Sequence, residues 1–306
     1  MSAPAGRARL ATALLLGVTA VWGSTFFLIR DLVESVPPAD FLAVRFGIAA
    51  VVMFLLFRRQ TLALSRRELR LGVVLGVLYG FAQVLQTMGL QHTDASVSGF
   101  ITGTYVVLTP LLAAVVLRDH VALFTWGAVA LATAGIALLS LQGLAVGLGE
   151  ALTLVAALLY AGHIVALGRW STPRAAVGLA TVQAGVITVV TSVAAAPDGL
   201  TLPSDGGQWA SLLYMALAAG ALALWAQTWA QAHLTATRAA VVMAMEPVFA
   251  AFFAVVLGGE DLTRRMLLGG ALVVAAMYLV ELRATSRDPT ATAAEDPPVE
   301  ALHHDV

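Results

Sequence analysis

Apolar runs of roughly 20 residues follow one another along most of the chain, and short polar or turn-rich stretches separate them. A helix of about 20 residues crosses the hydrocarbon core of a bilayer. Strands are excluded, because an open sheet leaves backbone groups unsatisfied in lipid and barrel strands would alternate polar and apolar residues. The pattern predicts an all-α integral membrane protein with ten transmembrane helices, at approximately 8–29, 39–57, 70–90, 96–117, 121–140, 147–168, 175–196, 208–231, 236–257 and 265–283.

Two stretches of the chain resemble each other at a fixed separation. QTMGLQHTDAS begins at Gln86, and QTWAQAHLTAT begins at Gln227, 141 residues later. The same shift takes Asp119, past the end of the fourth predicted helix, onto Glu260, past the end of the ninth. We therefore expect two five-helix units, at 8–140 and 147–283. Because five is odd, the two units have inverted topology, which is typical of secondary transporters with a binding site near the membrane midplane.

Each repeated stretch contains one histidine, and the pair could form a split ligand site. Five predicted crossings separate His92 from His233, so we expect them at opposite membrane surfaces, unable to share a metal ion or a substrate. The stretches are better explained as two tight helix connections. In this interpretation Ser96 and Thr237 are the N-caps of the fourth and ninth helices.

Composition narrows the function further. Hydrophobic residues make up 59% of the chain and charged residues 11%, against about 25% charged residues in soluble domains. The net charge of −1 provides no basic surface for nucleic acid. Cysteine is absent, which excludes disulfides and thiolate metal sites. All 17 basic residues are arginine; without lysine there is no Gly-x-x-x-x-Gly-Lys-Ser/Thr loop, which excludes ATP-driven transport by this chain alone.

The arginines predict how the helices are oriented. Arg7 and Arg9 precede an apolar run that is too long for a signal peptide and long enough to span, so we expect it to be the first membrane helix. With a cytoplasmic N-terminus, 13 arginines fall in cytoplasmic segments and 4 in outer segments or outer helix ends. This bias predicts that both termini are cytoplasmic. The polar, acidic segment 284–306 is expected to be a disordered cytoplasmic tail.

Four segments resemble the two EamA domains of the drug/metabolite transporter superfamily: AVWGSTFFLIR, FLAVRFGIAAVV, SVSGFITGTYVVLTPLLAAVVLR and ATRAAVVMAMEPVFAAFFAVVLGGEDLT. The resemblance covers nearly everything except the tail. It implies a multi-pass permease of the bacterial cytoplasmic membrane, usually an exporter of metabolites, amino acids or drugs. The prolines depart from symmetry, since Pro110 follows Ser96 by fourteen residues and Pro247 follows Thr237 by ten. We therefore do not transfer roles between the halves at this point.

Glu246 is the most distinctive polar position, close to the middle of the ninth predicted helix. A charged group at that depth costs about 2.5–3.5 kcal/mol to insert, so Glu246 should face a cavity or a partner. Pro247 follows directly, frees a backbone carbonyl near Met243 and is predicted to break the helix, as Pro110 is in the fourth helix. Glu246 is a candidate proton carrier. The alternative, a hydrogen-bonded structural glutamate that joins the halves, stays open.

Polar residues recur at helical spacing on helices that are otherwise apolar. Ser98, Thr102 and Tyr105 share one face of the fourth helix, and the third, sixth and eighth helices have similar faces. We expect a wet central cavity; for any single residue, interhelical hydrogen bonding is the alternative. The predicted lining is Trp22, Tyr79, Gln83, Gln86, Thr102, Tyr105, Tyr160, His163, Trp225, Gln227 and Met243.

His163 and Arg45 can each be interpreted as structural residues or as functional ones. His163 is the one histidine inside a predicted helix, and it is either a packed neutral residue or a group that titrates or stacks on a substrate. Arg45 lies near the outer end of the second helix. We expect a structural role for it, by extending outward to the interface or by pairing with Asp40, in preference to the alternative, substrate binding.

These features favour a secondary transporter, an exporter, that moves a small organic solute by alternating access with Glu246 as its candidate proton carrier. The alternatives are an integral membrane enzyme acting on lipid-linked substrates and a non-transporting sensor subunit, neither of which needs an inverted duplication. The chain contains no His-x-x-His cluster or Asp-rich loop, so we expect no enzyme activity, no metal and no cofactor. The expected partners are the solute and the lipid bilayer. The lining fits amino acids, nucleoside-like compounds, sugars and amphipathic drugs equally, and no oligomeric state is indicated.

Overall fold

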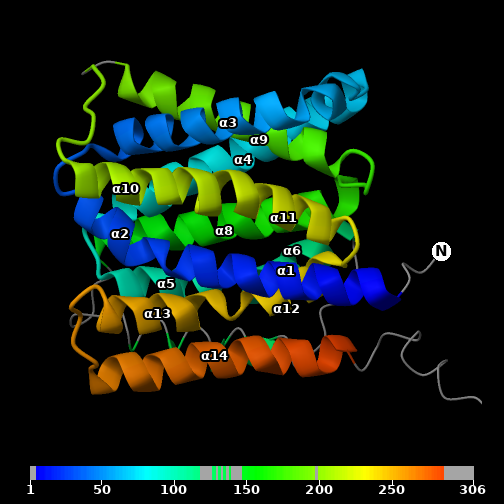
Figure 1. Cartoon of the computed structure of the whole chain (residues 1–306). Helices are drawn as coiled ribbons and strands as arrows, with labels where there is room; N and C mark the ends of the chain where they lie inside the picture. The colour runs from blue at the N-terminus through cyan, green and yellow to red at the C-terminus, as the bar shows by residue number, and fades with distance from the viewer. Residues whose placement is uncertain are drawn as a thin grey trace, which may run out of the picture.

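The computed structural model describes residues 5–117, 147–196 and 199–285, together with a few positions between 126 and 138. Within these residues every regular element is a helix. The helices lie side by side in one bundle, with the N-terminus at one end (Figure 1). The fifth predicted helix, 121–140, lies mostly outside the described residues. The same holds for the predicted tail, 284–306, apart from its first two residues, which belong to the last helix.

Each of the other predicted ranges is occupied by one helix or by consecutive shorter helices. The elements are α1 (Ala5–Gly23), α2 (Thr25–Leu32), α3 (Pro38–Leu62), α4 (Arg66–Leu90), α5 (Ala95–Gly103), α6 (Tyr105–Leu117), α8 (Leu148–Trp170), α9 (Ala176–Ala195), α10 (Gly206–Tyr214), the π-helix η1 (Met215–Leu222), α11 (Ala223–Gln231), α12 (Ala236–Met243), α13 (Glu246–Val256) and α14 (Arg264–Thr285). Seven helical stretches of the described chain are long and apolar enough to cross a membrane. The chain is therefore a multi-pass, helical membrane protein.

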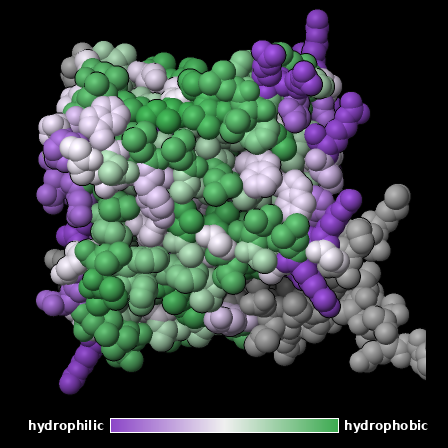
Figure 2. Space-filling model, in the orientation of Figure 1, coloured by the Kyte–Doolittle hydropathy of each residue, from purple (hydrophilic) through white to green (hydrophobic). Residues whose placement is uncertain are grey.

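The surface has the polarity that a bilayer requires. Hydrophobic side chains cover the middle of the face seen in Figure 2, whereas hydrophilic side chains gather at the two ends of the bundle. Leu55 and Val193 are each 70% exposed, and many other large apolar side chains are exposed as well. An apolar surface of this extent is unfavourable in water and favourable in contact with lipid tails. The bundle therefore lies across the membrane, with its helix ends at the two interfaces.

Local polar contacts determine where two of the helices begin. α4 begins at a capping box, in which Ser65 Oγ accepts from the Glu68 N–H and Glu68 Oε2 accepts from the Ser65 N–H. α10 begins after Asp205, whose carboxylate accepts from the backbone N–H groups of Gly207 and Gln208. Both caps satisfy backbone donors that the first helical turn leaves without partners.

The predicted N-caps of the fourth and ninth membrane helices are wrong. α5 begins directly after Asp94, so Ser96 lies inside the helix. α12 begins directly after Thr235, so Thr237 also lies inside, and the Thr235 hydroxyl accepts a backbone N–H three residues later. Each connection contains more than one short polar residue that could act as an N-cap. Composition alone could not select which of them precedes the first helical turn.

Interruptions of the membrane helices lie deep in the bundle. Pro247 stands in the first turn of α13, directly after the break that separates α12 from α13, as predicted. The prediction for Pro110 is wrong: α6 continues through this proline, and the fourth membrane helix is interrupted at Thr104 instead. A proline removes one helix hydrogen bond, which a helix packed among neighbours tolerates. The two breaks are nonetheless equivalent, since α6 begins at Tyr105 and α13 begins at Glu246, 141 residues later.

Helices from both halves of the chain interleave. α3 packs along α9, α4 packs against α8 and α9, and α13 packs against α5 and α1. The last contacts are close: a Cβ atom added at Gly23 would lie 2.5 Å from Phe249 Cβ, and one added at Gly99 would lie 2.5 Å from Ala250 Cβ. Small residues at such crossings let helix backbones approach in a membrane. This arrangement brings the broken helices α5–α6 and α12–α13 together.

Candidate functional site

A pocket inside the bundle collects most of the residues predicted to line a cavity. It contains ten of the eleven predicted lining residues together with Glu246: Trp22, Tyr79, Gln83, Gln86, Thr102, Tyr105, Tyr160, His163, Gln227 and Met243. Trp225 lies apart from it, half-buried on α11 and packed against the apolar core. The pocket also has lining residues that the sequence pattern did not select: Thr25, Phe26, Ile29, Arg45 and Ile164. Both halves of the chain therefore contribute to one site.

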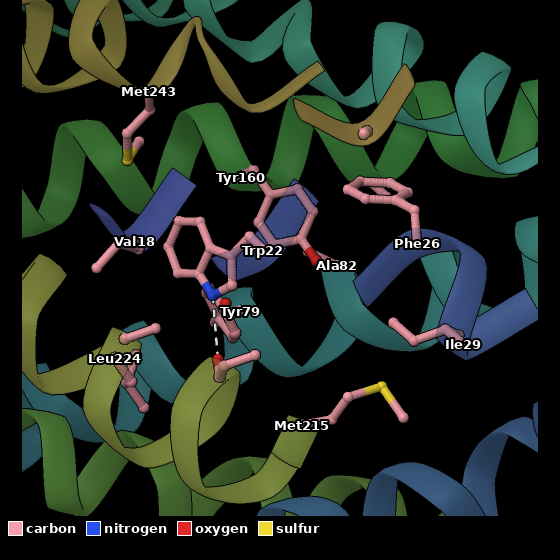
Figure 3. Packing of buried hydrophobic residues seen from close by; sticks show 14 of the residues in the cluster. Val18, Trp22, Phe26, Ile29, Tyr79, Ala82, Tyr160, Met215, Leu224 and Met243 are labelled. Atoms are coloured by element: carbon pink, nitrogen blue, oxygen red, sulfur yellow. Dashed lines mark hydrogen bonds between the residues drawn. The ribbon is translucent and has the colours of Figure 1, made fainter. Parts of the chain in front are cut away.

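Aromatic rings form one wall of this pocket. Trp22, Tyr79 and Tyr160 lie close together in Figure 3. The Tyr79 and Tyr160 rings meet edge to face with centroids 5.4 Å apart. Trp22 Nε1 donates to the Ala219 carbonyl at 3.0 Å, so the indole is held by the π-helix η1. The wall is thus apolar but fixed in orientation by a polar contact.

A chain of hydrogen bonds crosses the pocket from α4 through α8 to α5. Gln83 Nε2 donates to the Tyr160 hydroxyl at 2.7 Å, and this hydroxyl donates to Gln86 Oε1 at 2.9 Å. Gln86 Nε2 in turn donates to Thr102 Oγ1 at 2.9 Å. All four side chains are buried. The predicted polar faces of three helices therefore meet as one network.

Tyr105 and Glu246 meet at the two helix breaks. The Tyr105 hydroxyl oxygen lies 2.8 Å from Glu246 Oε2 and 2.9 Å from the Met243 carbonyl oxygen. The hydroxyl has one proton, and a carbonyl oxygen can only accept. Tyr105 can therefore donate to Met243 and still hydrogen-bond Glu246 only when Glu246 is protonated and donates to Tyr105. When Glu246 is ionised, it competes with the Met243 carbonyl for the same proton.

Two further predicted residues lie in the pocket with defined partners. Gln227 Nε2 donates to Gln231 Oε1 at 3.2 Å. His163 Nε2 lies 2.7 Å from Gln183 Oε1, and the Gln183 amide nitrogen donates to the Leu179 carbonyl. His163 Nε2 therefore carries a hydrogen. His163 is fully buried, and its ring packs against the Tyr79 ring, as expected for a packed neutral histidine.

Arg45 lies inside the bundle and not at the outer interface, where the sequence pattern placed it. It is 2% exposed, so it does not extend outward, and its Nε donates to the Met215 carbonyl at 3.2 Å. Asp40 forms no ion pair with it in the described part of the chain, and the Asp40 carboxylate accepts the Thr201 N–H at 2.8 Å. The guanidinium also stacks over the Phe46 ring, 5.0 Å from its centroid. The expected pairing is absent, and each of the two side chains instead hydrogen-bonds a backbone group from the second half of the chain.

Several polar atoms of the pocket have no protein partner. Among the buried side-chain atoms without a hydrogen bond are Arg45 Nη1, Gln83 Oε1, His163 Nδ1 and Gln227 Oε1. Each belongs to a residue that lines the pocket. Buried polar groups normally find a partner, so a concentration of unpaired ones indicates a place where water or a ligand binds.

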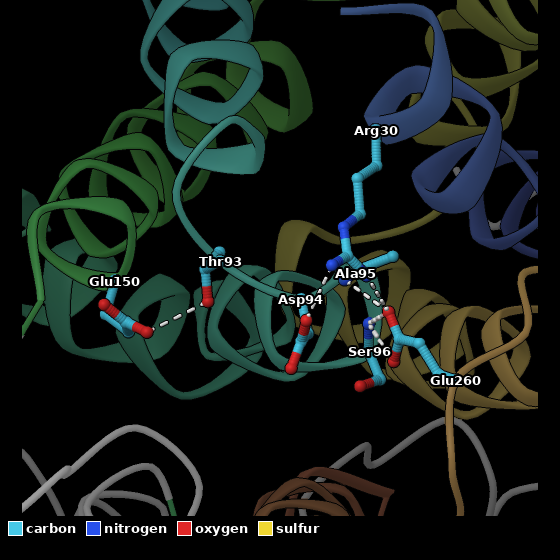
Figure 4. Close-up of polar contacts among 7 residues, drawn as sticks. All are labelled: Arg30, Thr93, Asp94, Ala95, Ser96, Glu150 and Glu260. Atoms are coloured by element: carbon cyan, nitrogen blue, oxygen red, sulfur yellow. Dashed lines mark hydrogen bonds and ion pairs between the residues drawn. The ribbon is translucent and has the colours of Figure 1, made fainter. Parts of the chain in front are cut away.

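A second polar cluster lies at one end of the bundle, where the end of α2, the start of α5 and the segment before α14 meet (Figure 4). Arg30 pairs with Asp94 at 3.0 Å and with Glu260 at 3.1 Å. Glu260 also accepts from the Ala95 N–H at 2.7 Å and from the Ser96 N–H at 3.3 Å. A carboxylate at a helix N-terminus satisfies free backbone donors and interacts favourably with the helix dipole. The cluster joins the two halves at this end.

No metal site is found within the part of the chain that the structure describes, where no three His, Cys, Asp or Glu side chains lie close enough together. The two repeated histidines have different surroundings. His92 borders a surface pocket beside Arg30, whereas the His233 ring packs on Trp229, 4.3 Å between centroids.

Comparison with known proteins gives a consistent result. The model of the EamA-like transporter family matches this chain twice, at residues 9–141 and 147–282. An uncharacterized transporter of Archaeoglobus fulgidus is 31% identical over 266 residues, which cover 87% of this chain and 84% of that protein. The uncharacterized inner membrane transporter YedA of Escherichia coli K12 is 27% identical over 275 residues, which cover 88% of this chain and 89% of that protein. A crystal structure that is 17% identical superposes with a TM-score of 0.67 over 90% of this chain and 98% of its own, so the two share a fold.

Proposed function

Because the chain belongs to the EamA-like transporter family, we propose that it is a secondary transporter that carries a small organic solute through the central pocket. One observation supports this most directly: polar and aromatic side chains from both halves converge in a buried pocket, where several polar atoms lack a partner. Polar groups inside a membrane bundle are unfavourable and usually mark the path of a solute or an ion. The proposed direction is export across the bacterial cytoplasmic membrane, as the family resemblance implies.

The proposed architecture is ten helices in two inverted five-helix units, 8–140 and 147–283. In its support, the 141-residue shift relates not only the repeated sequence stretches but also the starts of α6 and α13. A hydrogen bond between Tyr105 and Glu246 joins these equivalent positions. The distribution of arginines favours both termini in the cytoplasm. In this arrangement the Arg30–Asp94–Glu260 cluster faces outward.

Alternating access is the proposed mechanism. The outward cluster binds α2 and α5 to the segment before α14, so these contacts must separate before a solute can leave. The broken helices meet at the pocket, where a change of helix angle alters access most directly. We infer that the described conformation is closed at its outer end.

Glu246 is the proposed proton carrier. Protonated, it can donate to Tyr105 and leave the Tyr105 proton for the Met243 carbonyl; ionised, it takes that proton for itself. The carbonyl at the break of the ninth helix then loses its partner. Binding and release of a proton would in this way change the stability of the break, and couple proton movement to the helix angle.

Reconstitution tests the function and the proton carrier together. The purified chain in proteoliposomes should release solutes from an enclosed metabolite mixture and leave the lipids unchanged. Glu246→Gln keeps a donor for Tyr105, so the variant should fold and insert while flux falls and loses its pH dependence. Glu34→Gln, a change to an exposed carboxylate, is the matched control and should behave as wild type.

The same assay separates the alternatives. Lipid turnover without solute flux would identify an enzyme acting on lipid-linked substrates, and the absence of both would favour a sensor subunit. Wild-type flux at every pH in Glu246→Gln would leave Glu246 with the structural role of joining the halves.

A further inference from the structure

Arg45 brings a positive charge into the interior of the bundle without an acidic partner among the described residues. Its side chain is 2% exposed, and the ion pairs found in the described part of the chain both use Arg30. Its Nη1 is buried and makes no hydrogen bond. Arginine does not lose its charge in proteins, so this guanidinium is in an unfavourable state until an anion approaches it.

The guanidinium is held ready for such an anion. Its Nε donates to the Met215 carbonyl at 3.2 Å, at the first residue of the π-helix η1. Its Cζ atom lies over the rings of Phe46 and Phe41, at 5.0 Å and 5.7 Å from their centroids. These contacts fix one edge of the group and leave Nη1 free. A donor that is already fixed loses little conformational freedom when a ligand binds.

The other charges of the pocket narrow the class of anion. Arg45 is the only arginine and Glu246 the only carboxyl group among the lining residues. A phosphate monoester would add roughly two negative charges to a pocket that contains one arginine and one carboxyl group. A carboxylate brings one, and its planar pair of oxygens fits a guanidinium. The aromatic wall formed by Trp22, Tyr79 and Tyr160 can then hold the organic part of the solute.

We propose that the transported solute carries a carboxylate group and that Arg45 binds it. This inference rests on the proposed function, since it assigns a role within the same pocket. Organic acids and amino acids both offer this group. An amino acid would in addition present an ammonium group, which can donate a hydrogen bond to the Glu246 carboxylate.

The first test uses the unaltered chain. Proteoliposomes are loaded with a mixture of organic acids, amino acids and the carboxamide of each, and the released compounds are identified by mass spectrometry. Loss of a charge-assisted hydrogen bond weakens binding by about 10- to 100-fold, so an acid that is released should move at least about tenfold faster than its carboxamide. Release of amino acids but not of their deaminated counterparts would identify the zwitterion as the source of the carboxylate, and the reverse would identify the free acid.

The second test uses variants and the acid-to-carboxamide ratio of flux, which incomplete folding does not alter. Arg45→Gln should bring this ratio close to one, and Arg45→Lys, which keeps the charge but not the planar fork, should give an intermediate ratio. Arg58→Gln alters an exposed arginine near the end of the same helix and should leave the ratio unchanged.

The outcomes distinguish this inference from the function itself. Absence of flux for every compound counts against the proposed function. Flux of an acid and its carboxamide at equal rates, flux confined to compounds without a carboxylate, or an unchanged ratio in Arg45→Gln overturns the role of Arg45 and leaves the transporter proposal standing.

Discussion

Tyr160 links two amide side chains in the wall of the pocket. Its hydroxyl accepts from Gln83 at 2.7 Å and donates to Gln86 at 2.9 Å. Tyr160→Phe removes this oxygen, and the buried atoms Gln83 Nε2 and Gln86 Oε1 lose their hydrogen bond to it, which should lower the stability by about 1–3 kcal/mol. Thermal unfolding in detergent measures this loss. Tyr278→Phe on α14 is the control, because it removes only an exposed contact of the hydroxyl with Met245 Sδ, a weak acceptor, and should change the midpoint little. An equal midpoint for Tyr160→Phe would contradict the network.

Tyr105 and Glu246 should be energetically coupled, because one hydroxyl serves both Glu246 and the backbone at the break. Tyr105→Phe leaves the Met243 carbonyl and Glu246 without this donor. We expect Tyr105→Phe to destabilise the protein less in the Glu246→Ala background, which lacks this contact, than alone, with an interaction energy of about 1–2 kcal/mol. A double-mutant cycle on thermal or denaturant unfolding measures it. Additive effects of the two substitutions would show that the contact contributes nothing to stability.

Among single residues, the sequence pattern selected most of the pocket, but it missed five lining residues, Arg45 among them, and it included Trp225, which lies apart from the pocket. Ten predicted residues line the pocket because polar side chains on apolar helices have few other places to lie. Arg45 was assigned a structural role, because the sequence does not show which carbonyl groups a neighbouring helix will offer. Trp225 was selected for its type, and the π-helix just before it changes which face of the chain turns inward.

Among the elements, α13 packs so closely against α1 that a single substitution can test the contact. A Cβ atom at Gly23 would lie 2.5 Å from Phe249 Cβ and 2.8 Å from the Ala250 backbone nitrogen. Gly23→Ala should therefore push α1 and α13 apart and lower stability by about 1–3 kcal/mol. Gly17→Ala on the same helix meets nothing within 4 Å and is the control. It should be neutral or stabilising by up to about 1 kcal/mol, and equal unfolding midpoints for the two variants would contradict the close contact.

The interruptions of the helices were only partly predictable. A proline predicts a break because it lacks an N–H, and this was right for Pro247. It was wrong for Pro110, which α6 accommodates. The fourth helix is instead interrupted at Thr104, directly after Gly103. The hydroxyl and the backbone N–H of Thr104 both donate to the Ile101 carbonyl, which tightens the turn. The repeat was the better guide, since Thr104 lies 141 residues before Met245, in the break before α13.

For the molecule as a whole, hydrophobicity predicted where the described helices lie but not how they pack. Membrane helices must be long, apolar and internally hydrogen-bonded, so their positions follow from the sequence. Packing depends on side-chain fit, which the sequence pattern does not contain. The pairing of α3 with α9 and of α4 with α8 and α9, which places the pocket between the halves, became evident only from the structure.

The inverted arrangement itself can be tested with the repeated histidines. The chain has no cysteine, so His92→Cys and His233→Cys each introduce a single thiol at equivalent positions of the two halves. If the halves are inverted, a membrane-impermeant maleimide should label His92→Cys on intact cells and His233→Cys only after permeabilisation. Labelling of both from the same side would contradict the inversion.

Two reference variants show how fast an exposed thiol is labelled on each side of the membrane. Ser204→Cys and Thr172→Cys place exposed thiols in the loops between α9 and α10 and between α8 and α9, which the proposed orientation assigns to the outer and the cytoplasmic side. His233 packs against Trp229, so its variant must first be labelled in permeabilised cells at a rate comparable to that of Thr172→Cys. Protection in intact cells then reports the side of the membrane rather than burial of the thiol, and the unaltered chain, which has no thiol, sets the background.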